Sequence, residues 1–164
     1  MITLLDAGQS KGDKYGRMRA MGATLYEEDF YEWTKRNAEL MRQGRLSEID
    51  VDNIAEEIES MGISAKRELL SRLTVLLAHL LKWQFQADKR TNSWASTIVT
   101  QRAEIRRLLA ASPSLAANLD AHIDDAFEDS VDRAMAETLL SRDHFPNTCP
   151  YSSNQVMDKN FWPA

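Results

Sequence analysis

Residues 50–86 carry the longest regular hydrophobic pattern in the chain. Gly62 lies inside this pattern without shifting its register, although a glycine costs roughly 1 kcal/mol in a helix interior. The pattern therefore predicts one helix of about 37 residues and about 55 Å. Its apolar residues recur at steps of three and four positions, which is the period of one face of an α-helix: Ile54, Ile58, Met61, Ala65, Leu69, Leu73, Leu76, Leu80 and Trp83.

The two halves of this helix differ in character. Residues 73–83 are apolar nearly all round, so we expect them to be buried on most sides. Residues 50–61 are amphipathic and acidic. A helix this long extends past what a single four-helix layer covers. A symmetric dimer would cover the apolar stripe that is left exposed.

Helix-capping signals divide the remaining chain. Thr24 and Glu27 form a capping box that starts a helix, and Gly44 marks its end. Asp50 is expected to cap the long helix, and Ser93 the one after it. Further signals predict a boundary at Ser112-Pro113, a helix to about Ser141, and a short helix that starts at the capping box Ser152/Gln155.

Together these elements predict an all-α fold. We expect a helical bundle of about four main helices around one long central helix, plus a short C-terminal helix. Residues 24–164 form one expected domain, a usual size for a single domain. Residues 1–23 lack a clear period and predict a mobile leader. Met18 and Met21 suggest the hypothesis that the native start lies downstream.

Composition restricts the environment and the partners. The net charge of −5 argues against a general nucleic-acid binder, which usually has a basic face. With one cysteine, Cys149, no intrachain disulfide can form. The first residues do not have the pattern of a signal peptide, and the longest apolar run is too short to span a bilayer. We therefore expect a cytoplasmic protein that does not interact with a membrane.

Six sequence blocks, in order, resemble a known family. The blocks are LYEEDFYEW, IAEEIESMG, LTVLLAHLLKWQ, SWASTIVTQR, SPSL and FPNTCPY, and the resemblance runs from Leu25 to Trp162. The chain is similar to the bacterial "domain of unknown function twenty-nine" family, which is common in cyanobacteria and also found in proteobacteria. The resemblance implies a compact helical domain of unknown function. It assigns no catalytic residue.

One acidic stripe suggests metal chemistry. Asp52, Glu56 and Glu59 lie at positions i, i+4 and i+7 of the long helix. Carboxylates spaced in this way suit Mg²⁺ or Mn²⁺, as in all-α nucleotide pyrophosphohydrolases. The simpler interpretation is a solvated acidic face near a helix N-terminus. A second acidic group is available on the helix predicted to end near Ser141: Asp125, Glu128, Asp129 and Asp132.

A basic and aromatic patch is the leading candidate for a binding site. Arg90, Trp94 and Arg102 offer two cations and a flat ring on which a base can stack. An anion can also bind at the free N–H groups near Ser93. In the simpler interpretation Trp94 belongs to the core. The arginines 102, 106 and 107 then pair with Asp120, Asp124 and Asp125.

The histidines and the cysteine do not form a recognisable catalytic motif. His79 lies among leucines without a Glu three residues before it, so a buried, hydrogen-bonded histidine is expected instead of a metal ligand. Cys149 and His144 are expected to be structural.

We therefore expect a non-catalytic domain, without a cofactor, that binds a macromolecular partner or itself. A divalent-metal-dependent enzyme on phosphorylated small molecules is the alternative, and a nucleic-acid ligand the third hypothesis.

Overall fold

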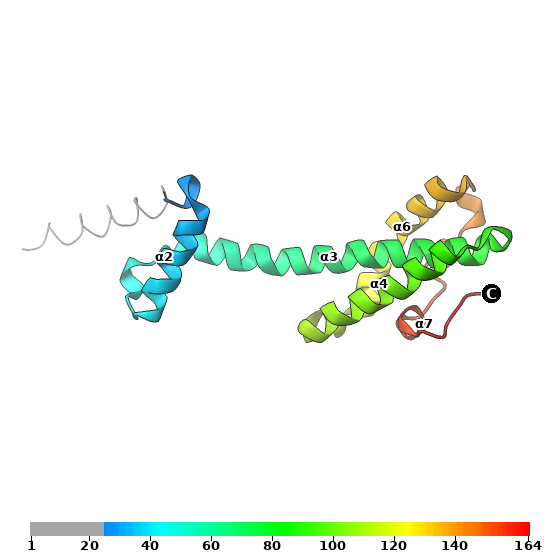
Figure 1. The fold of residues 1–164 in the computed structure, drawn as a ribbon. Coiled ribbons are helices and arrows are strands. Elements are labelled where there is room, and N and C mark those ends of the chain that lie inside the picture. Colours follow the sequence, from blue (N-terminus) through cyan, green and yellow to red (C-terminus); the bar gives the residue numbers. More distant parts are fainter. Residues whose placement is uncertain (1–24) are drawn as a thin grey trace, which may run out of the picture. The chain divides into compact units, whose positions relative to one another are not determined.

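The computed structural model describes residues 25–164, so the expected leader and the predicted cap Thr24 lie outside the described residues. All regular structure in the described part is helical, which confirms the all-α fold class. The central helix α3 is the expected long one and runs over Val51–Phe85, 35 residues (Figure 1). The other α-helices are α2 (Phe30–Arg42), α4 (Asn92–Ala111), α5 (Pro113–Ala116), α6 (Leu119–Thr138) and α7 (Ser153–Met157).

The chain divides into two compact units, and the boundary lies inside α3, between Met61 and Gly62. Unit 1 is Met1–Met61 and unit 2 is Gly62–Ala164. A single domain over residues 24–164 stays a prediction. Short 3₁₀ turns join the helices: η1 (Leu46–Glu48), η2 (Ala87–Lys89) and η3 (Arg142–His144). No helix among the described residues combines the length and the hydropathy needed to cross a bilayer.

Unit 1 contains α2, η1 and the first turns of α3. Asp29 caps α2 by accepting a hydrogen bond from the Glu32 N–H at 2.9 Å. Gly44 ends this segment as predicted, because its φ of +69° is a conformation that favours glycine. The N–H groups of Gly44 and Arg45 donate to the carbonyls of Met41 and Leu40, both at 3.0 Å, which closes the helix end.

Asp50 joins the two helices of unit 1. Its carboxylate accepts a hydrogen bond from Trp33 Nε1 at 3.1 Å, and its backbone N–H donates to Asn37 Oδ1 at 2.9 Å. Trp33 and Asn37 are buried beside Leu40. These contacts hold α2 against the first turns of α3, and the core among residues 25–61 is small.

Unit 2 has a larger core, built around the second half of α3. As expected, residues 76–82 of α3 are buried on all sides. The tail after α6 folds back onto the helices and buries Phe145, Tyr151 and Val156. Buried side chains from three helices form the rest of this core: Leu69, Leu73, Leu76, Leu77, Leu80, Leu81, Ile98, Ile105, Ile123, Phe127 and Val131.

The structure corrects two helix boundaries in unit 2. Thr91, and not Ser93, caps α4, because its hydroxyl accepts from the Trp94 N–H at 3.3 Å. The helix expected from Pro113 to about Ser141 is split into α5 and α6, and α6 ends at Thr138. Leu139 follows in a left-handed conformation, with φ 62°. The predicted capping box at Ser152 and Gln155 is confirmed at the start of α7.

Candidate functional site

Unit 1 leaves one apolar face of α3 open to solvent. Val51, Ile58 and Met61 are 48, 63 and 71% exposed. They lie seven and three positions apart, so they share one face of the helix. We call these three residues the α3 stripe. Ile58 and Met61 belong to the apolar pattern that predicted the helix, and Val51 directly precedes it. Later members of this pattern are buried in unit 2, namely Leu69, Leu73, Leu76 and Leu80, and Trp83 is partly buried.

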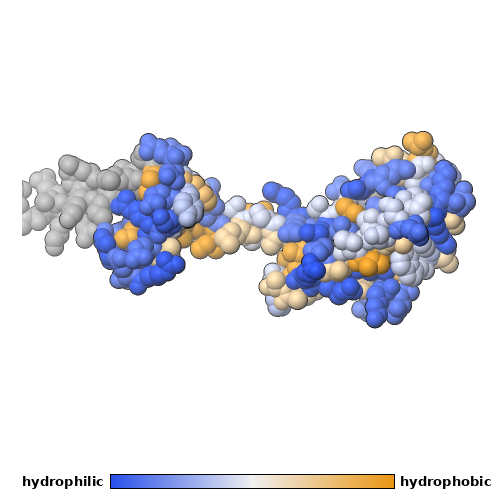
Figure 2. All heavy atoms as spheres, in the orientation of Figure 1, coloured by the Kyte–Doolittle hydropathy of each residue, from blue (hydrophilic) through white to orange (hydrophobic). Residues whose placement is uncertain are grey.

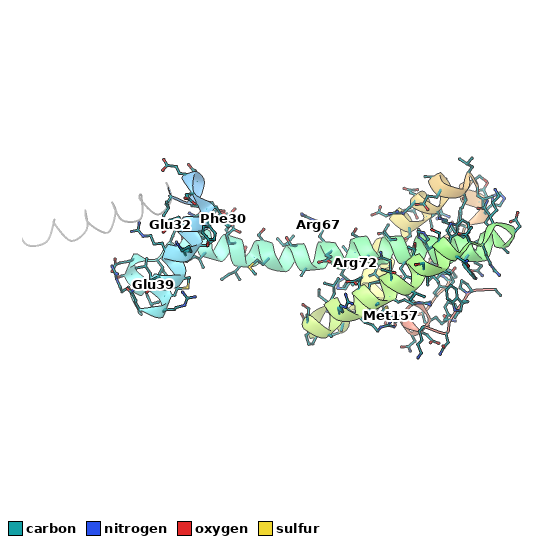
Figure 3. All side chains as sticks on the ribbon, in the orientation of Figure 1. Phe30, Glu32, Glu39, Arg67, Arg72 and Met157 are labelled. Atoms are coloured by element: carbon teal, nitrogen blue, oxygen red, sulfur yellow. The ribbon has the colours of Figure 1, made fainter. Side chains whose placement is uncertain are left out.

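An aromatic cluster of unit 1 lies next to the first turns of α3. Phe30 stacks on Trp33 with ring centroids 5.5 Å apart, and Tyr26 meets Trp33 edge-on at 4.8 Å. Phe30 is half exposed and is labelled where α2 meets α3 in Figure 3. Figure 2 shows hydrophobic side chains gathered at this junction within unit 1. The apolar surface of unit 1 is therefore larger than the α3 stripe alone.

Acidic side chains flank the α3 stripe. Glu57 and Glu59 directly precede and follow Ile58, so they project about 100° to either side of it. Glu57 accepts a hydrogen bond from the Tyr26 hydroxyl. This bond, with the charge of the carboxylate, raises the pKa of Tyr26 to about 12. Glu59 forms no ion pair with any residue that the structure describes.

The charge of the chain is concentrated in unit 1. Residues 25–61 contain eleven Asp and Glu against four Lys and Arg, a net charge of −7. Residues 62–164 contain twelve of each kind and are neutral overall. The acidic residues of unit 1 thus account for the acidity of the described chain. They surround its exposed apolar face with negative potential.

The predicted metal ligands are exposed. Asp52, Glu56 and Glu59 lie on α3 in unit 1, whereas the second acidic group lies on α6 in unit 2. Among residues 25–164, no group of three or more His, Cys, Asp or Glu side chains is arranged to hold a metal ion. A metal at the acidic stripe stays a prediction.

Arg102, predicted to bind a ligand, is 1% exposed. Its Nε donates to the Val156 carbonyl at 2.8 Å and its Nη2 to the Phe161 carbonyl at 2.9 Å. Burial lowers the pKa of this guanidinium, with Asp158 partly offsetting the effect. Within the described structure, Arg102 therefore anchors the C-terminal segment to α4.

The other two residues of this predicted patch lie nearer the surface. Arg90 donates from Nε to the Trp83 carbonyl at 2.8 Å and lies over the Trp83 ring. Trp94 is partly buried, and its ring receives the Lys82 ammonium at 4.3 Å. Both residues thus have partners within unit 2. Binding of a base or an anion at this patch stays a prediction.

The interpretation that arginines 102, 106 and 107 pair with the aspartates 120, 124 and 125 of α6 is wrong. Arg106 donates to the Met157 carbonyl at 3.5 Å, and Arg107 pairs with Glu104 of its own helix at 2.6 Å. Asp125 pairs instead with Lys66 at 3.8 Å. Carbonyl groups of the folded tail provide acceptors that the sequence pattern does not reveal.

The sequence pattern did not reveal an ionic cluster between α3 and α6 in which the lysine is buried. Lys82 is 3% exposed and donates to Glu137, which also accepts from Arg133 at 2.9 Å. Burial raises the pKa of Glu137, but the hydrogen bonds and charges of the two cations outweigh it and hold that pKa below its ordinary value. The only sequence signal was a lysine within the leucine-rich half of α3.

His79 is buried and hydrogen-bonded, as expected, and Cys149 is partly buried. The His79 Nδ1 lies 2.8 Å from the Val75 carbonyl.

Cys149 donates to the Tyr151 carbonyl, and burial raises the pKa of its thiol, which disfavours the reactive thiolate. The His144 Nδ1 lies 3.0 Å from the Ser141 hydroxyl. His122 is buried with both ring nitrogens lacking a partner among the described residues.

Two open grooves lie on the described surface. One, of about 730 Å³ beside α2, is lined by side chains of both charges, and Arg45 and Glu48 within it pair with each other. The other, of about 480 Å³ in unit 2, contains Arg67 and Arg72, which Figure 3 labels. Arg72 already pairs with Glu68 at 2.8 Å. Neither groove combines an apolar lining with converging polar groups, as small-molecule sites do.

Comparisons with known proteins give a family and no activity. The chain has no significant match among the curated proteins or the solved structures. One family model matches residues 25–162, nearly the whole described chain and the span over which the sequence blocks are similar to the family. The protein therefore belongs to the family described as "Domain of unknown function DUF29".

Proposed function

We propose that this protein is an interaction module whose unit 1 binds a helical segment of a partner protein through the α3 stripe. One observation carries the proposal: Ile58 and Met61 are 63 and 71% exposed within a regular apolar pattern whose later leucines are buried. Contiguous exposed apolar surface rimmed by polar residues marks interaction sites. An amphipathic helix binds such a surface through residues at helical spacing.

The small core among residues 25–61 supports this role. Its buried apolar side chains among residues 25–61 are Trp33 and Leu40. Two large buried side chains remove little apolar surface from water, and such burial is the main favourable term in folding. A partner helix on the α3 stripe would add the apolar burial that unit 1 lacks.

Site-specific photocrosslinking tests the proposal. A photoreactive phenylalanine analogue replaces Ile58 or Met61 in the full chain, in cells that make the native protein. Leu139, which is 91% exposed on unit 2, provides the matched control position. We expect a discrete adduct of higher mass from positions 58 and 61 and none from position 139. The same adducts from all three positions would contradict the proposal. An adduct of two identical chains would assign the stripe to self-association.

A further inference from the structure

We propose that the partner segment of unit 1 is a basic amphipathic helix. This inference rests on the proposed function, because it names the chemistry of the partner for the same stripe. It follows from the placement of charge around the apolar residues. The α3 stripe supplies the apolar contact, and the acids beside it select the charge of the occupant.

The length of the stripe sets the apolar face of the partner. Val51 and Met61 are ten residues apart, which is about 15 Å along the helix axis. Ile58 lies between them, and its neighbours Glu57 and Glu59 project to both sides. A bound helix of about three turns would thus place its apolar side chains on the stripe and its flanking side chains beside carboxylates. Lysines or arginines at these flanking positions complement the carboxylates.

The free acids strengthen this argument. Glu56 and Glu59 are exposed, and within the described residues neither forms an ion pair. The net charge of −7 over residues 25–61 makes a second copy of unit 1 a poor occupant, because two such surfaces repel each other. Nucleic acid is disfavoured for the same reason. A basic helix gains from both the apolar stripe and the charge.

Two synthetic peptides test the inference with the full chain. Each is an amphipathic helix of about 18 residues with the same leucine face, and the polar face is all lysine in one and all glutamate in the other. Fluorescence anisotropy gives the affinity of each labelled peptide. We expect the lysine peptide to bind at least about tenfold tighter at low salt. This difference should shrink at about 1 M salt, where the Debye length falls to about 3 Å.

Paired variants locate the binding. Ile58→Ser with Met61→Ser should weaken binding of the lysine peptide about tenfold or more, because the apolar contact is lost. Glu57→Gln with Glu59→Gln should weaken it several-fold, while the amide oxygen introduced at position 57 still accepts from Tyr26. Asp129→Asn with Asp132→Asn, two exposed acids of α6, serves as the control for general acidity and should leave the affinity unchanged.

The outcomes separate this inference from the proposed function. Equal affinity of both peptides, lost in the Ile58/Met61 variant, would overturn the charge inference and leave the interaction role standing. A lysine peptide that binds the Ile58/Met61 variant as tightly as the natural protein would place the contact elsewhere and overturn the inference. Failure of both peptides, with adducts still formed at position 58, would also overturn only the inference. Failure of both peptides and of the adducts would overturn both.

Discussion

At the scale of single residues, buried cations hold unit 2 together. Arg102 and Lys82 are both nearly inaccessible, yet each has an acceptor: tail carbonyls for the first and Glu137 for the second. Burying a charge is costly unless hydrogen bonds and an opposite dipole or charge compensate it. The contribution of each cation therefore depends on acceptors far away in the sequence.

Replacing Arg102 with Met should destabilise unit 2 by roughly 3 kcal/mol, because buried tail carbonyls lose their donor. Urea denaturation gives the change in unfolding free energy. Arg107→Met is the control, since Arg107 is exposed and pairs only with Glu104 of its own helix, and it should change stability by less than about 0.5 kcal/mol. A loss for Arg102→Met as small as that of Arg107→Met would contradict the anchoring role of Arg102.

His79 should make stability depend on pH. Burial lowers its pKa below the ordinary 6.5, and the bond to the Val75 carbonyl offsets this only in part. The fold therefore favours neutral His79, so its stability is complete above about pH 6.5 and falls as the pH drops below that value. The pKa of Glu137 is also lowered, so its contribution to stability is complete above its ordinary pKa of 4.5 and is lost only below that pH. His79→Leu should flatten the decline between about pH 6.5 and 5 in thermal unfolding. An unchanged decline would contradict this assignment.

The residue scale also shows what the sequence does not reveal. Burial of His79 was predictable, because leucines surround it in the pattern. The role of Arg102 was not, because its acceptors are carbonyls more than fifty residues away, which only folding brings near. Ile58 and Met61 were predicted as apolar positions of the helix. Their exposure depends on which segments cover α3, which periodicity does not specify.

At the scale of elements, α3 and α6 are joined by the Lys82–Glu137 pair. Glu137→Ala should destabilise the protein by roughly 3–5 kcal/mol, because Lys82 is left buried without its carboxylate. Lys82→Met should cost less, since Glu137 keeps its bond to Arg133 and is partly exposed. Guanidinium unfolding of both variants tests this order. The reverse order would show that Glu137 matters little for the burial of Lys82.

The two described helix-associated glycines should respond in opposite ways to alanine. Gly44 has φ +69°, so Gly44→Ala should cost about 1 kcal/mol of backbone strain. Gly62 lies inside α3, and a Cβ there would meet nothing within 4 Å. Gly62→Ala should therefore stabilise α3 by roughly 0.5–1 kcal/mol. Thermal unfolding should shift down for the first and up for the second. A downward shift for Gly62→Ala would mean that a close approach at this position is needed.

Element boundaries were less predictable than the elements. Pro113 correctly marked a helix start, but the split between α5 and α6 has no proline or glycine to announce it. Asn118 lies at this split, and its side chain donates to the Ser114 carbonyl at 3.0 Å, which competes with a continuous helix. Leu139 adopts a left-handed conformation that a leucine seldom adopts. The hydrophobic pattern of the sequence therefore did not reveal where these helices end.

At the scale of the whole molecule, apolar burial and charge are unevenly divided. Unit 2 contains the large core and is neutral, whereas unit 1 has a small core, an exposed apolar face and a net charge of −7 over residues 25–61. Exposed apolar side chains and excess negative charge therefore occur together on the described part of unit 1. We propose that the α3 stripe is open in the free protein and becomes covered when a partner helix binds.

The most direct test observes the Met61 methyl group by NMR with a soluble paramagnetic probe. Among the described methionines, Met61 and Met41 are 71 and 40% exposed, and Met41, on α2, gives the exposed reference signal. Met135 and Met157 are partly buried and serve as the protected references. We expect strong attenuation of the Met61 signal in the free, full chain, and protection when the lysine peptide is added at saturation. A Met61 methyl already protected in the free monomer would contradict the account, because another part of the chain would then cover the stripe.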